Sequence, residues 1–155
     1  MRETREEHIE RRIRDFHAMR INCAETVLTI FSEEKCVEGG FYPRIATAFG
    51  AGLAGRQEMC GALSGALMVI GLALGREVGG DRTPAYQAGR AFIEWFEAQY
   101  GTASCREITG IDLSTPEGQA AFRAPGGGHE MICEPMVAEV VRKLLGMYGE
   151  RELLL

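Results

Sequence analysis

The sequence lacks any segment suited to crossing a membrane or directing secretion. Its longest uncharged stretch lies between Glu58 and Arg76, and this stretch is slightly short and too rich in glycine for a membrane span. Residues 1–8 are dominated by charge and have no apolar core of the kind that a secretory signal needs. We therefore expect a cytoplasmic protein with no membrane partner, in which cysteines stay reduced unless they react or bind something.

Positive charge is also scarce. The 17 lysines and arginines are outnumbered by 22 acidic residues, which gives a formal net charge of -5. Nucleic-acid binding through counterion release requires clustered basic residues, so we expect no nucleic-acid partner. The hydrophobic fraction of 46% and the charged fraction of 25% are those of a folded protein, and the length predicts one domain over residues 1–155.

No run of alternating apolar and polar residues is long enough to require a β-strand. Apolar residues recur at helical spacing almost everywhere instead. The pattern predicts an all-α fold, a compact single-domain bundle of about six to eight helices. The predicted helices cover 4–19, 22–35, 43–49, 58–74, a stretch that starts at Thr83, 104–110, a stretch that starts at Thr115, and 133–148.

Glycine, by contrast, is abundant, with 20 residues, and some of it lies inside the predicted helix over 58–74. Gly61 and Gly65 are four residues apart, as are Ala62 and Ala66, so one face of this central helix carries almost no side chains. A glycine inside a helix costs about 1 kcal/mol relative to alanine. We therefore expect another helix to approach this face closely, with close approach by a cofactor as the alternative.

The cysteines lack any of the familiar paired spacings. No C-x-x-C is present, which excludes a thioredoxin-type motif and a c-type haem attachment. Structural zinc sites usually draw their ligands from paired knuckles, so the dispersed spacing also argues against one. The five cysteines are Cys23, Cys36, Cys60, Cys105 and Cys133.

Two of these cysteines directly follow predicted helix caps. Asn22 precedes Cys23 and Ser104 precedes Cys105, and each cap is followed three residues later by a glutamate that completes a capping box. The free N–H groups and the positive dipole end at a helix start lower the pKa of a thiol. Both cysteines are therefore candidate thiolates.

Cys60 and Cys133 are expected in a similar setting. Cys60 lies in the first turns of the glycine-rich helix, and Cys133 directly precedes Glu134-Pro135, where proline belongs in a first helical turn. A thiolate is both the nucleophile of disulfide exchange and a ligand for soft metals. Cys36 lies at a helix end, and we exclude it from the candidate site.

Several segments resemble the C_GCAxxG_C_C family of redox-active proteins, over about residues 15–145. The segments that carry the resemblance are Asn22-Cys23-Ala24-Glu25-Thr26-Val27-Leu28, Phe49-Gly50-Ala51-Gly52-Leu53, Cys60-Gly61-Ala62-Leu63-Ser64-Gly65-Ala66-Leu67, Cys105-Arg106-Glu107-Ile108-Thr109-Gly110-Ile111-Asp112-Leu113 and Cys133-Glu134-Pro135-Met136-Val137. The resemblance maps the four family cysteines onto Cys23, Cys60, Cys105 and Cys133, and it implies redox chemistry. Some similar proteins are selenoproteins, and a similar domain in certain multihaem cytochromes is associated with an iron–sulfur centre.

These observations lead to two hypotheses from different classes. In the first, the four cysteines converge and serve as ligands of an iron–sulfur cluster or another metal, or as reversible dithiol/disulfide pairs, in an electron carrier or oxidoreductase with a redox partner still to be identified. In the second, the thiols are buried and inert, and the chain is a non-catalytic helical interaction or assembly protein.

Two further patterns point away from other kinds of site. Residues 50–55 match G-x-G-x-x-G, but no strand precedes them, so we expect them to shape a loop that brings Cys60 towards Cys23 rather than to bind a nucleotide. His8, His17 and His129 are scattered, and only His129 is close enough in sequence to Cys133 to share its helical face. We interpret them as surface histidines, with ligation by His129 as the alternative.

The last expectations concern two glycine- or leucine-rich segments. The Gly126-Gly127-Gly128 loop has no side chains to pack, so we expect it to be mobile and Cys133 to be the most accessible of the four cysteines. Leu153-Leu154-Leu155 follow a charged turn and would form an exposed apolar patch. A homodimer is the simplest way to cover such a patch.

Overall fold

The computed structural model describes residues 2–153, and the regular structure in this range is helical. The all-α prediction is confirmed, and the only strand-like feature among these residues is an isolated bridge between Met59 and Ser104. The elements are α1 (Arg5–Ala18), α2 (Cys23–Glu34), α3 (Tyr42–Ala46), the 3-10 turn η1 (Thr47–Phe49), α4 (Gly61–Leu74), α5 (Thr83–Tyr100), α6 (Cys105–Thr109), α7 (Pro116–Arg123), the π-helical turn η2 (His129–Cys133) and α8 (Glu134–Tyr148).

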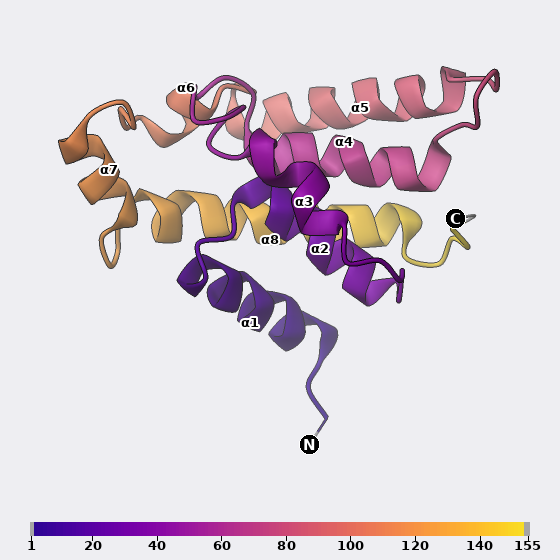
Figure 1. The fold of residues 1–155 in the computed structure, drawn as a ribbon, viewed down its shortest axis with the longest axis horizontal. Coiled ribbons are helices and arrows are strands. Elements are labelled where there is room, and N and C mark those ends of the chain that lie inside the picture. The colour runs from indigo at the N-terminus through magenta and orange to yellow at the C-terminus, as the bar shows by residue number, and fades with distance from the viewer. Residues whose placement is uncertain (1, 154–155) are drawn as a thin grey trace.

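The helices surround one core. Figure 1 shows α4 and α5 lying side by side, α8 running along the middle of the molecule, and α1 on the outer side of α8. The apolar faces of α1, α2 and α8 are buried in this core. In the aromatic stripe of α5, Phe92 and Phe96 are fully buried whereas Trp95 and Tyr100 are half-buried. The chain folds as a single helical domain.

Helix boundaries follow the predicted caps. Asn22 Oδ1 accepts the Glu25 N–H at 3.0 Å, and Glu25 Oε2 accepts the Asn22 N–H at 2.8 Å, so the capping box before α2 is complete. Thr4 and Glu7 form an equivalent box before α1. These reciprocal bonds satisfy N–H groups that would otherwise have no partner within the helix.

The bare face of α4 packs on the start of α2. A Cβ added to Gly61 would lie 3.2 Å from the Cys23 Cβ, and one added to Gly65 would lie 2.8 Å from the Ala24 carbonyl oxygen. Only glycine lets the two backbones approach this closely. The expectation of a close helix–helix contact at this face is confirmed.

Helix α1 docks through both apolar and charged contacts. Ile9, Ile13 and Phe16 are buried in the common core. On the flanks, Arg12 pairs with Glu33 of α2 at 2.5 Å, and Arg142 of α8 pairs with Glu6. Exposed ion pairs of this kind add little stability individually, so the apolar stripe holds α1 in place.

Helix α8 ends at Tyr148 as predicted, but its start and the segment after it differ from the prediction. The helical path begins before residue 133, because η2 runs directly into α8. Pro135 lacks an N–H and its ring crowds the carbonyl four residues back, which the wider π turn accommodates. At the C-terminus, Leu153 is half-buried against the core, so it is not part of an exposed patch, whereas Leu154 and Leu155 lie outside the described residues. The homodimer stays a prediction.

Among residues 2–153, no helix combines the length and the apolar character needed to cross a membrane.

The α2–α4 contact generates a stability prediction. Gly65→Ala forces a methyl group against the Ala24 carbonyl, and we expect a loss of about 1–2 kcal/mol of unfolding free energy, since overpacking outweighs the gain in helix propensity. Gly71→Ala in the same helix is the matched control, because no heavy atom lies within 4 Å of its added Cβ. That variant should gain up to about 1 kcal/mol. Equal changes in urea denaturation would contradict the packing argument.

Candidate functional site

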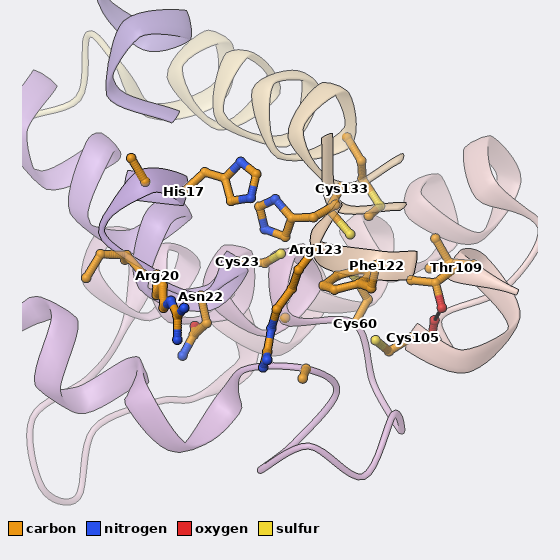
Figure 2. Close-up of a pocket in the computed structure, with 17 residues that line it drawn as sticks. His17, Arg20, Asn22, Cys23, Cys60, Cys105, Thr109, Phe122, Arg123 and Cys133 are labelled. Carbon is orange, nitrogen blue, oxygen red and sulfur yellow. Dashed lines mark hydrogen bonds between the residues drawn. The ribbon is translucent and has the colours of Figure 1, made fainter. Parts of the chain in front are cut away.

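One cavity of about 320 Å³ is lined by all four of the candidate cysteines. Figure 2 shows Cys23, Cys60, Cys105 and Cys133 around this cavity. All five cysteines of the chain are free thiols, and Cys36 is exposed, away from the cavity. The structure therefore brings together the four cysteines that the sequence selected and leaves out the fifth.

Cys23 and Cys60 are brought together by the α2–α4 contact. Cys23 is the first residue of α2, and Cys60 is the residue that directly precedes α4. Gly61, the next residue, has its Cα against the Cys23 Cβ, where any larger residue would separate the two helix starts. The glycine next to Cys60 is thus part of the site's construction.

Cys105 is tied to Cys60 by reciprocal backbone hydrogen bonds. The Cys60 N–H donates to the Ala103 carbonyl at 2.8 Å, and the Cys105 N–H donates to the Glu58 carbonyl at 2.6 Å. These bonds form the short antiparallel bridge at Met59 and Ser104. They fix the start of α6 against the start of α4, although 45 residues separate the two cysteines along the chain.

The loop that precedes Cys60 has a left-handed backbone. Residues 51–55 all have positive φ, as does Gln57, and three of the residues between 51 and 55 are not glycine. Gly52 is required here, because an added Cβ would lie 2.7 Å from the Cys105 Cβ. The prediction that this G-x-G-x-x-G segment shapes a loop is supported, but its close contact is with Cys105 rather than Cys60.

A buried glutamine holds the loop after α6 in place. Gln57 Nε2 donates to the Ile111 carbonyl at 2.8 Å, and its Oε1 accepts the Leu113 N–H, also at 2.8 Å. Because both ends of the amide are paired, its burial carries no unsatisfied polar group. Gln57 thereby links the segment before Cys60 to the segment after Cys105.

The cap before α6 is only partly as predicted. Ser104 Oγ accepts the Glu107 N–H at 3.3 Å, so Ser104 is the N-cap. Glu107 does not return to the Ser104 N–H to complete a box. Its carboxylate accepts a hydrogen bond from the Thr102 hydroxyl, which itself accepts the Ser104 N–H at 3.1 Å. Thr102 thus bridges Ser104 and Glu107, which would bond directly in a complete capping box.

Cys133 is not the exposed member of the group, contrary to prediction. Its residue is 4% exposed, whereas Cys23 is the only one of the four that is partly exposed. The glycine loop before it is packed through its backbone, since a Cβ on Gly127 would lie 2.3 Å from the Ala121 carbonyl oxygen, and Gly128 is buried against Ile111. Because glycine has no side chain, the backbone of this loop packs closely against its neighbours.

Burial reverses the expected effect of the helix starts on the thiols. Desolvation, together with the nearby Cys23, raises the pKa of Cys60 to about 12, although the N–H groups of Leu63 and Ala62 act in the opposite direction. Burial likewise raises the pKa of Cys105 to about 12. The prediction of lowered thiol pKa values at these helix starts is wrong for the protein without a bound ion, because removal from water outweighs the helix dipole.

Cys23 is influenced by two other groups of the site. The neighbouring Cys133 thiol and burial raise the Cys23 pKa well above the ordinary value, against the His129 imidazole, which lowers it. The Cys23 thiol is therefore close to both Cys133 and His129. The interpretation of His129 as a surface histidine is wrong, since its ring lines the cavity.

Sequence reasoning missed two further residues, His17 and Glu134. The imidazoles of His17 and His129 are stacked with centroids 4.1 Å apart, and Glu134 Oε1 lies 2.5 Å from His17 Nδ1. Glu134 directly follows Cys133, so proximity to a candidate cysteine was an available signal. No sequence signal pointed to His17, because only the docking of α1 against η2 and α8 places this residue beside His129 and Glu134.

Two arginines also line the cavity. Arg20 and Arg123 are both exposed, and Figure 2 shows them beside the cysteines. They give this part of an acidic protein a local positive charge, which attracts anions and acidic partners.

Comparison with known proteins identifies the family. A family model described as "Putative redox-active protein (C_GCAxxG_C_C)" matches residues 21–147, which is most of the chain. The chain belongs to the C_GCAxxG_C_C family. No curated protein and no solved structure matches it. All four cavity cysteines lie within the matched residues, whereas His17 lies outside them.

The thiol pKa values generate a labelling prediction. A thiol with a pKa of about 12, as for Cys60 and Cys105, is a thiolate in only about one molecule in 100,000 at pH 7. In the folded, metal-free protein we expect iodoacetamide to label exposed Cys36 rapidly and these two cysteines slowly, at a rate that rises about tenfold per pH unit below pH 12.

Peptide mass spectrometry separates the sites, and complete labelling of all five cysteines in denaturant is the control. Labelling of Cys60 and Cys105 at the rate of Cys36 at pH 7 would show that these thiols are not desolvated.

Proposed function

We propose that Cys23, Cys60, Cys105 and Cys133 form the redox centre of an electron-transfer protein and hold an iron–sulfur cluster. One observation carries the proposal: four cysteines from four separate segments line a single cavity, while the fifth cysteine is exposed elsewhere. Four thiolates are the usual ligand set of such clusters. Membership of a redox-active family agrees with this function.

The chemistry of the donor set fits a soft metal centre. Three of the four cysteines are buried and the fourth has its thiol turned towards Cys133 and His129. Cys23 raises the pKa of Cys60, and both of them raise the pKa of Cys105. Thiolates at these buried positions therefore require a compensating positive charge. Metal binding supplies that charge and releases the thiol protons. When bound, an iron–sulfur cluster supplies reversible one-electron transfer.

The chain itself contributes the surroundings of the thiols. The backbone N–H groups of Ala62 and Leu63, in the first turn of α4, favour the Cys60 thiolate. The packing of the helices keeps Cys60, Cys105 and Cys133 buried. The exposed Arg20 and Arg123 would favour an acidic electron-transfer partner at the cavity. A reducing compartment such as the cytoplasm would keep the free thiols available for loading.

Reconstitution tests the cluster directly. After anaerobic incubation with iron and sulfide, we expect the wild-type protein to retain both and to absorb in the visible range. Cys36→Ser is the matched control and should retain as much iron as the wild type. Serine at any one of positions 23, 60, 105 and 133 should lower the retained iron at least severalfold. Colourless, iron-free wild-type protein would contradict the cluster, and retention by every variant would contradict the assigned ligands.

The proximity of the Cys23 and Cys133 thiols favours a second candidate function, a reversible dithiol/disulfide couple. In this chemistry the two thiols lose two protons and two electrons and form one S–S bond. The disulfide of a partner molecule accepts the protons and electrons and becomes two thiols. The nearby His129 lowers the pKa of Cys23 and so favours its thiolate, against the effects of burial and Cys133.

This second function predicts a specific linkage. Oxidation of the metal-free protein with a small disulfide should join Cys23 to Cys133 before any other pair, as detected by mass mapping of peptides. Linkage of Cys60 to Cys105 first, or a random mixture, would argue against it. If neither cluster nor specific disulfide forms, the non-catalytic helical interaction protein becomes the better hypothesis.

A further inference from the structure

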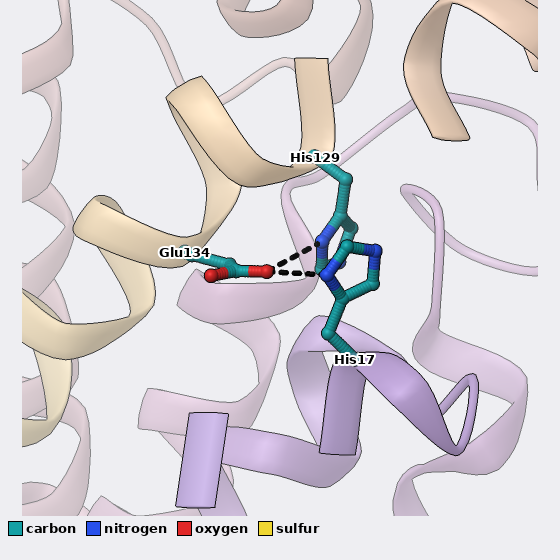
Figure 3. A group of neighbouring side chains, drawn as sticks. All are labelled: His17, His129 and Glu134. Atoms are coloured by element: carbon teal, nitrogen blue, oxygen red, sulfur yellow. Dashed lines mark ion pairs between the residues drawn. The ribbon is translucent and has the colours of Figure 1, made fainter. Parts of the chain in front are cut away.

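Three side chains converge at the edge of the cysteine cavity, and none of them is a cysteine. They are His17 at the end of α1, His129 at the start of η2 and Glu134 at the start of α8. One ligand atom from each lies within 4.8 Å of the other two. Figure 3 shows the two imidazoles, one from α1 and one from η2, facing the same carboxylate oxygen.

Two of the converging atoms are buried without a hydrogen-bond partner. They are His129 Nδ1 and Glu134 Oε1, which lie 3.6 Å apart. His17 Nδ1 comes within 2.5 Å of the same oxygen, but not in the alignment of a hydrogen bond. A buried polar atom left unpaired costs about 1–3 kcal/mol. One proton can join only two of these three atoms, whereas a cation accepts lone pairs from all three at once.

The two imidazole rings are stacked, with centroids 4.1 Å apart at an angle of 30°. Imidazole nitrogens and carboxylate oxygens are common ligands of transition-metal ions.

The orientation of His129 is fixed by neighbours on both sides. The Phe122 ring packs edge-on against it, with centroids 5.4 Å apart and an angle of 88°. On another side, His129 Nδ1 faces Glu134 Oε1 at 3.6 Å, and the Cys23 thiol is also close to this residue.

We propose that His17 Nδ1, His129 Nδ1 and Glu134 Oε1 bind a divalent transition-metal ion of the zinc or iron(II) class, at a site separate from the four-cysteine centre. Two imidazoles and one carboxylate suit these ions, and three protein ligands leave a coordination position free. His17 lies outside the residues matched by the family model, so the match does not include this ligand set. The two sites are neighbours, because Glu134 directly follows Cys133 in the sequence.

Cobalt(II) is the probe, because its absorption distinguishes sulfur ligands from nitrogen and oxygen ligands. We expect cobalt bound at this site of the reduced, metal-free protein to give visible bands without a near-ultraviolet sulfur-to-cobalt charge-transfer band. Binding at the cysteines would add that band. His17→Gln and Glu134→Gln should each weaken the first kind of binding at least about tenfold and leave the charge-transfer band unchanged.

His8→Gln is the matched control, since His8 lies on the same helix and contacts Glu3 and Glu34 instead. It should bind cobalt as the wild type does, and circular dichroism verifies that all variants are folded. Unchanged cobalt affinity and stoichiometry in both His17→Gln and Glu134→Gln would overturn the proposal and indicate an imidazole–carboxylate pair only. Absence of the charge-transfer band while the visible bands remain would count against metal binding by the cysteines and leave this site intact.

Discussion

The close approach of α4 to the first turn of α2 is the constraint on which the site depends. Gly61 and Gly65 place the backbone of one helix against that of the other, and this contact brings Cys23 next to the segment that contains Cys60. Helices whose interface residues carry ordinary side chains lie 8–10 Å apart between axes. A larger separation would open the cavity at its centre, whatever the rest of the chain did.

The same packing decides the chemical state of the thiols. Helix starts offer N–H groups to Cys60, yet the apolar interior removes the sulfur from water, and the second effect is the larger. The protein without a bound ion therefore holds neutral thiols, in contact with one another and with an imidazole. Such neutral thiols react slowly with reagents in solution. They can still bind a metal ion, because its positive charge stabilises the thiolates.

Local sequence signals predicted the helices and the four cysteines, and long-range packing determined the rest. The caps at Asn22 and Ser104 and the glycine face of α4 are short-range patterns, so each could be read from a few residues. The His17–His129–Glu134 cluster depends on the docking of α1, which no local pattern encodes. The pKa prediction was wrong for the same reason, because burial is a property of the whole fold.

The order in which the cysteines occur along the chain has a kinetic consequence. Cys60 and Cys105 are joined by backbone bonds between distant segments, and Cys133 follows both, close to the last helix. Contacts between distant segments form late, because loop closure costs entropy before the contacts compensate for it. During synthesis the thiols therefore stay exposed to solvent and to oxidants until α8 docks. Cys60, Cys105 and Cys133 become buried only once the C-terminal part of the chain has folded.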